Sequence, residues 1–333
     1  MNGKLYSVRS EVVPRLQWNA NSGYCGETSF ICAGLNFGQY CSQWTAREQA
    51  SPLPQDQGAS QLLVGSGDDT LAAQNMRLKA SEFDGSAGET LRFIVWMKSH
   101  LASGHVPIIG VYNNTGDLDE PPSLADGQYD HIVPVLGWDS DLPIIAEQGV
   151  QYHPGDFITF SDNGLYGAPP EYPYLYRYPV GPFQGDRAAG SAPDGRVYTL
   201  PDKVQNCGIV IEGVLDDDGD CIPVRISSSR HSEPSPDPRL APGSTPTSPL
   251  WDGPPAPTPL RLTATVDLRG QSGPWTLYRY DDFAKVPVRN FNAAAGSAVQ
   301  HWHIPAGGPT FVVQHDAMSN ETVVFRAVPA CAP

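Results

Sequence analysis

The first third of the chain has the apolar spacing of helices. Apolar residues at 91, 94, 95 and 101 lie on one helical face, and a glycine at 104 follows them. Asp68, Asp69 and Thr70 are capping residues in front of good helix formers. The pattern predicts helices over residues 25–35, 71–78 and 89–101, an extended segment over 1–24 and an irregular one over 39–58.

From residue 106 onward, short apolar runs between polar turns are typical of strands. The runs at 208–215 and 222–227 predict a hairpin, because the turn residues 216–219 lie between them. Other strand-like runs lie at 106–112, 131–138, 156–161, 260–266, 275–280, 298–304, 310–313 and 322–327. Helices followed by strands predict an α+β fold, with helices packed on an antiparallel sheet.

A stretch rich in Pro, Ser, Thr and Gly divides the chain. Residues 228–259 cannot bury much apolar surface, and Pro-rich segments of this kind act as semi-rigid spacers. The short strands beyond it have the regular spacing of a small all-β sandwich. The sequence therefore predicts a first domain over 1–227, a linker over 228–259 and a β-sandwich domain over 260–333.

Charge and hydropathy limit the partners. Acidic residues outnumber basic ones, 36 to 21, and no Lys/Arg cluster is present, which argues against nucleic acid and anionic membranes. No apolar run reaches the roughly 20 residues that span a bilayer. The first residues lack the apolar segment of a signal peptide, whereas abundant Gly and Pro and little Lys favour secretion after signal removal. A cytoplasmic location is the alternative.

Two residues have the context of reactive groups. Cys25 opens the first predicted helix, and His131 opens a predicted strand. A cysteine at a helix N-terminus feels the positive end of the dipole, and a nearby imidazole shares its proton, so both favour a thiolate. Taken singly, Cys25 could be a buried small hydrophobe and His131 a hydrogen-bonded core histidine.

The order of several features resembles the papain-like cysteine peptidases, and more closely their C39-like branch. A segment containing Gln and Asn precedes Cys25-Gly26 at a helix start, and a Gly-x-x-Pro-Ile-Ile strand follows at residues 104–109. Then come His131-Ile132-Val133-Pro134-Val135 and a strand that ends in Asp162-Asn163. The resemblance covers roughly residues 14–170 and implies a papain-like first domain.

The resemblance also implies roles for individual residues. Cys25 would be the nucleophile and His131 its general base and later acid. The group that orients the imidazole should lie where the strand over 157–161 ends. Alternation along that strand favours Asp162, with Asn163 as a substitute.

An amide before the nucleophile is expected to complete the set. Together with the backbone N–H of Cys25, it would donate to a developing oxyanion. Gln17 is favoured for this role, although Asn19 has the expected offset with a shorter side chain.

The resemblance implies a cysteine peptidase that cleaves peptide or protein substrates through a thioester, with no metal and no organic cofactor. A transamidase or peptide ligase would use the same acyl-enzyme. The alternative from another class is a catalytically silent papain-fold binding protein, which a disulfide from Cys25 to Cys32 or Cys41 would favour. A further possibility is that the C-terminal domain contacts carbohydrate or a surface.

The remaining motifs have simpler interpretations. Cys32 and Cys41 flank a predicted turn and could form a disulfide across it. His301 and His303 share a strand face without an evident third metal ligand. The aromatic stretch over 172–178 is either a binding surface or an ordered loop over the domain.

Overall fold

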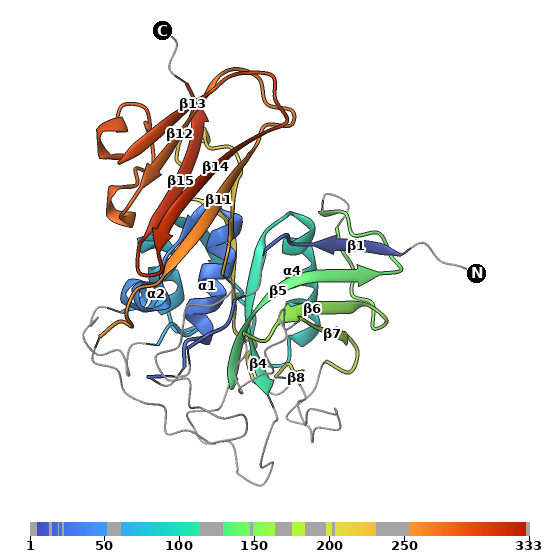
Figure 1. Ribbon diagram of the computed structural model, residues 1–333. Helices are drawn as coiled ribbons and strands as arrows, with labels where there is room; N and C mark the ends of the chain where they lie inside the picture. Colours follow the sequence, from blue (N-terminus) through green and yellow to red (C-terminus); the bar gives the residue numbers. More distant parts are fainter. Residues whose placement is uncertain are drawn as a thin grey trace.

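The computed structural model describes residues 5–12, 15–18, 20–21, 23–51, 61–113, 129–146, 149–163, 175–183, 198–201, 204–230 and 253–330. Within these ranges the chain forms a mixed α+β fold with few helices, and its strand pairs are antiparallel (Figure 1). No helix in this part of the chain is long and apolar enough to cross a membrane.

The larger sheet has β5 (His131–Ser140) near its centre, and all ten residues of this strand are buried. Eight strands of the described residues belong to the sheet. Their order is β3 (Leu78–Glu82), β9 (Gly208–Val214), β4 (Val106–Asn113), β5, β6 (Phe157–Ser161) and β7 (Leu175–Pro179), while β1 (Tyr6–Arg9) pairs with β5 and β8 (Tyr198–Thr199) with β4.

Side-chain alternation along β4 and β5 gives this sheet two buried faces. Ile108 and Ile132 belong to a hydrophobic core that includes helix α1 (Cys25–Asn36). Ile109 and Val133 belong to a second core, which includes helix α4 (Thr90–Ala102). Successive side chains of a strand point to opposite faces, so the sheet lies between α1 and α4 (Figure 1).

Helix α2 (Gln43–Ala50) lies beside α1, and α3 (Asp68–Asn75) packs against α2 and β3. The hydroxyl of Ser42 accepts the N–H of Thr45 at 3.0 Å and caps the start of α2. The prediction of an irregular segment over 39–58 is wrong here. The buried face of α2 consists of Gln43, Ala46, Arg47 and Ala50, which have helical spacing but give little apolar signal.

Two smaller sheets come mainly from the C-terminal part. One has the order β10 (Val224–Ser228), β11 (Pro259–Asp267), β14 (Thr310–Met318). The other has the order β13 (Gln300–Ile304), β12 (Trp275–Tyr280), β15 (Val323–Pro329), β2 (Gln39–Tyr40). Short 3-10 helices lie at Phe283–Lys285 and Ala295–Ser297.

Two strand pairings cross the predicted domain boundary. Strand β10, placed by prediction in the first domain, pairs with β11, and β2, which follows α1, pairs with β15. Buried residues of both smaller sheets and of α1 belong to one hydrophobic core. The two parts of the chain are therefore packed together rather than only tethered. Residues 231–252 of the predicted linker lie outside the described residues.

The predicted hairpin between β9 and β10 is wrong. Strand β9 pairs with β3 and β4, and β10 pairs with β11. The residues between the two strands still form a local turn, in which the Asp216 carboxylate accepts the N–H groups of Gly219 and Cys221. In the aromatic stretch, residues 172–174 lie outside the described ranges, and the rest form β7, an edge strand paired with β6.

Candidate active site

Cys25 is the first residue of α1, at a point where two backbones approach closely. A Cβ atom on Gly26 would lie 1.9 Å from the carbonyl oxygen of Leu62, so only glycine fits directly after the cysteine. As the first residue of α1, Cys25 lies at the positive end of the helix dipole. Cys25 is half-buried and its thiol is not in a disulfide; Cys32 and Cys41 do not form their predicted bridge either.

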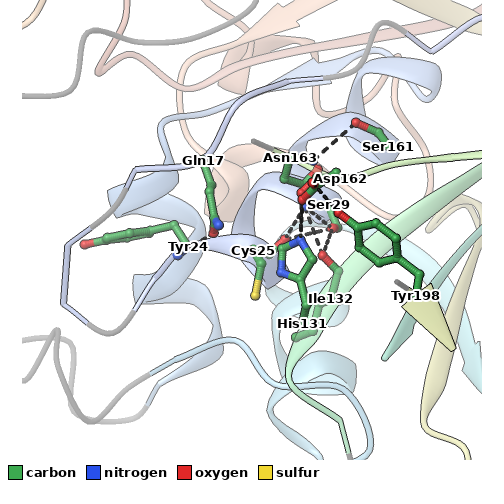
Figure 2. A network of polar contacts seen from close by, with 10 residues as sticks. All are labelled: Gln17, Tyr24, Cys25, Ser29, His131, Ile132, Ser161, Asp162, Asn163 and Tyr198. Atoms are coloured by element: carbon green, nitrogen blue, oxygen red, sulfur yellow. Dashed lines mark hydrogen bonds and ion pairs between the residues drawn. The ribbon is translucent and has the colours of Figure 1, made fainter. Parts of the chain in front are cut away.

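His131 is the first residue of β5 and is fully buried. Its Nε2 lies 2.6 Å from the main-chain oxygen of Asp162 and 3.1 Å from Oδ1 of the same residue. Both oxygens act as acceptors, so Nε2 carries a hydrogen and Nδ1 is the nitrogen that can exchange a proton. Figure 2 shows this second nitrogen on the side of the ring that faces Cys25.

The surroundings of His131 favour its charged form. Burial lowers the pKa of His131, but the hydrogen bond to Asp162 and the proximity of Cys25 raise it to about 10. The imidazolium is therefore the favoured form of His131 at neutral pH. Within the described residues Nδ1 itself has no hydrogen-bond partner. A thiolate beside an imidazolium is a strong nucleophile with a proton donor next to it.

The two candidates for the third position have different contacts. Asp162 faces the imidazole, as described above. Asn163 has a φ of 62°, in the left-handed region, and its side chain turns toward the start of α1. Its Nδ2 donates to the main-chain oxygens of Cys25 at 3.1 Å and Ile132 at 3.0 Å. The structure therefore brings Asp162 against His131, while Asn163 ties α1 to β5.

Gln17 lies beside the nucleophile with its amide held in one orientation. Its Oε1 accepts the N–H of Tyr24 at 3.1 Å, and its backbone N–H donates to the carbonyl of Asn163 at 2.8 Å. The side chain is 8% exposed, and within the described ranges its Nε2 has no hydrogen-bond partner. A buried, unused N–H donor near Cys25 is suited to an oxyanion. The alternative donor, Asn19, lies outside the described residues.

Two residues that sequence reasoning missed complete this network (Figure 2). Tyr198, in β8, donates its hydroxyl hydrogen to Oδ2 of Asp162, the carboxylate oxygen that His131 does not use. Ser29 donates to the main-chain oxygen of Cys25 at 2.7 Å and accepts from Asn163 at 3.1 Å. A polar residue one helical turn after Cys25 is a usable sequence signal, whereas nothing near Tyr198 in the sequence points to Asp162.

In the part of the chain that the structure describes, no group of three His, Cys, Asp or Glu side chains could hold a metal ion. His301 and His303 are both exposed on β13. The arrangement around Cys25 instead has the parts for acyl transfer: a nucleophile, an imidazole that can move a proton, a carboxylate that orients it, and amide donors.

Comparisons with protein-family models, curated proteins and solved structures find no match to this chain. The chemistry of the site is therefore argued from its own residues.

Proposed function

We propose that the chain is a cysteine peptidase acting on peptides or proteins through a thioester. The observation that carries the proposal is the placement of His131 between Cys25 and Asp162 (Figure 2). The three residues come from the start of α1, the start of β5 and the end of β6. A purely structural histidine would not need one nitrogen held by Asp162 and the other directed at a cysteine.

The proposed reaction uses these groups in turn. The Cys25 thiolate attacks the scissile carbonyl carbon; a C–S bond forms, and the carbonyl electron pair moves onto oxygen. The Gln17 amide and the Cys25 backbone N–H donate to this oxyanion, each donor worth about 3 kcal/mol in comparable sites. The C–N bond then breaks, and the proton on His131 Nδ1 passes to the leaving amine.

The thioester is then hydrolysed. Water attacks its carbonyl carbon while giving a proton to His131 Nδ1, and collapse of the second oxyanion expels the Cys25 thiolate. The products are a carboxylic acid and the original thiolate–imidazolium pair. An amine in place of water would give a transamidase with the same residues.

The proposal includes a papain-like first part of the C39-like type and a C-terminal β-sandwich. Support comes from a helix that opens with Cys25 and packs on an antiparallel sheet, and from two small sheets that share one apolar core. Secretion, and contact of the C-terminal part with carbohydrate or a surface, belong to the same proposal. A disulfide at Cys25 would favour the catalytically silent alternative, and the Cys25 thiol is not in a disulfide.

Replacing the nucleophile tests the proposal. Cys25→Ala should abolish cleavage of fluorescein-labelled casein by the full chain, measured as fluorescence release. Cys221→Ala is the matched control, because Cys221 is also a half-buried thiol that is not in a disulfide, and it should cleave at the wild-type rate. Cleavage by Cys25→Ala at the wild-type rate would refute the proposal. Mass spectrometry of products formed with an added amine separates hydrolysis from transamidation.

A further inference from the structure

A fully buried ion pair includes Glu27, two residues after the candidate nucleophile on α1. Arg47, on α2, is 0% exposed and Glu27, on α1, is 1% exposed. The Nε of Arg47 lies 2.6 Å from Oε1 of Glu27. Burying such a pair often adds no stability over apolar residues of similar volume, because desolvation offsets the attraction. The role of the Glu27–Arg47 pair is therefore argued from the other groups that its two side chains contact.

Arg47 uses its remaining donors on the loop that leads into Cys25. Its Nη1 donates to the carbonyl of Asn21 at 2.8 Å, and its Nη2 donates to the carbonyl of Gly23. The guanidinium also lies over the ring of Tyr24, 3.7 Å from its centroid. One side chain thus contacts three residues of the loop immediately before the nucleophile.

This loop has a backbone conformation that needs support. Asn21 has a φ of 46° and Gly23 a φ of 92°, both in the left-handed region. Non-glycine residues are uncommon there and are held by their surroundings. The fork of an arginine can fix two carbonyl groups at once, which a lysine cannot do with the same geometry.

Glu27 reaches the segment on the other side of the nucleophile. Its Oε1 accepts the backbone N–H of Leu62 at 3.0 Å. The neighbouring carbonyl of Leu62 is the group that leaves room only for glycine at position 26. The ion pair therefore links three parts of the chain. They are the residues just before Cys25, helix α1, which begins at Cys25, and the segment that contains Leu62, whose carbonyl lies close to Gly26.

The loop in turn orients the candidate oxyanion donor. The Tyr24 N–H holds Oε1 of Gln17 at 3.1 Å, and this contact leaves Gln17 Nε2 as the unused donor. The backbone N–H of Cys25 is the next amide along the same chain. Both donors in the proposed mechanism therefore depend on the conformation of residues 21 and 23–25.

We infer that Glu27 and Arg47 are positioning residues for the oxyanion site, acting through Asn21, Gly23 and Tyr24 and, through Tyr24, on Gln17. The inference rests on the proposed acyl-transfer chemistry. It distinguishes two reactions of Cys25: acylation passes through an oxyanion, whereas alkylation by iodoacetamide does not. Loss of the ion pair should slow the first reaction and leave the second unchanged.

The test compares both reactions in Glu27→Gln and wild-type full-length protein. Acylation of Cys25 by p-nitrophenyl acetate is followed as nitrophenol release, with the Cys25→Ala rate subtracted, and alkylation is followed by mass spectrometry. We expect acylation to fall about 10- to 100-fold, the loss typical of a displaced oxyanion donor. Alkylation should stay within about twofold, because it needs only the thiolate and its imidazolium.

Asp156→Asn provides the matched control. Asp156 and Lys98 form a second ion pair, 2.7 Å apart and 0% exposed, but Lys98 comes from α4 on the opposite face of the sheet. This variant should keep the wild-type ratio of acylation to alkylation. If Glu27→Gln folds poorly, the double variants Glu27→Gln/Arg47→Met and Lys98→Met/Asp156→Asn remove both charges of each pair and allow the same comparison.

The outcomes separate this inference from the peptidase proposal. A lower acylation-to-alkylation ratio in the Glu27 variants alone supports the inference. An unchanged ratio of acylation to alkylation, or an equal fall of both rates, would overturn the inference. Either result would mean that the ion pair has only a structural role. If wild-type protein is acylated but does not cleave casein, the peptidase proposal fails, while the ratio still decides the role of the ion pair.

Discussion

The surroundings of Cys25 and the C-terminal sheets are both well buried, but different forces hold them together. Around Cys25 the buried contacts join polar groups, as in the Glu27–Arg47 and His131–Asp162 pairs. In the C-terminal sheets most of them join apolar side chains such as Leu262, although Arg326 of β15 is also buried and donates to Gln39. Hydrogen bonds are directional, whereas apolar burial is not. Substitutions near Cys25 should therefore change chemistry, and those in the C-terminal sheets should change stability.

The largest effect is expected at the imidazole. His131→Ala should slow acylation of Cys25 by p-nitrophenyl acetate by about 10⁴-fold, as loss of a catalytic base does in comparable triads. His301→Ala, on the exposed face of β13, should have the wild-type rate. Circular dichroism checks that both variants are folded. A folded His131→Ala variant that is acylated at the wild-type rate would contradict the proposed role.

In the C-terminal sheets, a core substitution is expected to lower stability without changing the acylation rate of Cys25. Leu262 is fully buried, and Leu262→Ala should lower the free energy of unfolding by about 2–5 kcal/mol. Val312, 53% exposed on the same pair of strands, provides the control, and Val312→Ala should change stability little. Urea denaturation measures both. If folded Leu262→Ala protein is acylated more slowly, the separation between the two regions fails.

The sequence contains the main elements of the candidate site, but not the contacts that hold it together. Cys25 and His131 could be singled out because each opens a predicted helix or strand, whereas Asp162 was selected from the resemblance to papain-like peptidases and from alternation along its strand. Helix α2 was missed because its inward face is partly polar, and its Arg47 finds Glu27 only in the folded chain. The partner of β10 was missed for a different reason: it pairs with β11, on the far side of the predicted linker, rather than with β9, the strand directly before it in sequence.

A smaller effect is expected at Tyr198. Tyr198→Phe removes the hydroxyl that donates to Asp162 and should slow acylation about tenfold, because a hydrogen bond to a charged group is lost. Tyr280→Phe is the counterpart in the C-terminal sheets. Within the described residues the Tyr280 hydroxyl is buried without a hydrogen-bond partner, so its removal should leave the acylation rate unchanged and should not lower stability. Equal acylation rates for Tyr198→Phe and Tyr280→Phe would show that the Tyr198 hydroxyl does not contribute to the reaction.

The smallest effect is expected from pH between 7 and 9. The pKa of His131 is raised from 6.5 to about 10 by Asp162 and Cys25 against the effect of burial, so its proton should remain throughout this range. Acylation should therefore change little up to pH 9 and fall near pH 10. A fall of the acylation rate centred near pH 7 would instead show that the pKa of His131 is close to that of an ordinary imidazole, which would contradict this prediction.

The same shift affects stability. A group whose pKa is raised by folding stabilises the folded state fully below its unfolded value, and loses this contribution as pH rises through its folded value. The stability advantage of wild-type protein over His131→Gln should therefore be full below pH 6.5 and decline toward pH 10. Urea denaturation at several pH values checks the sign. An advantage that grows with pH would contradict it.

The most direct test of the account compares two thiols in one folded molecule. Burial raises the pKa of Cys221, whereas Cys25 has a helix N-terminus and His131 beside it. Brief iodoacetamide treatment of the native full chain at pH 7, followed by peptide mass spectrometry, gives both alkylation rates. The account predicts that Cys25 reacts about 100-fold faster or more. A Cys25 that reacts no faster than Cys221 would contradict the claim that folding creates a nucleophile at this position.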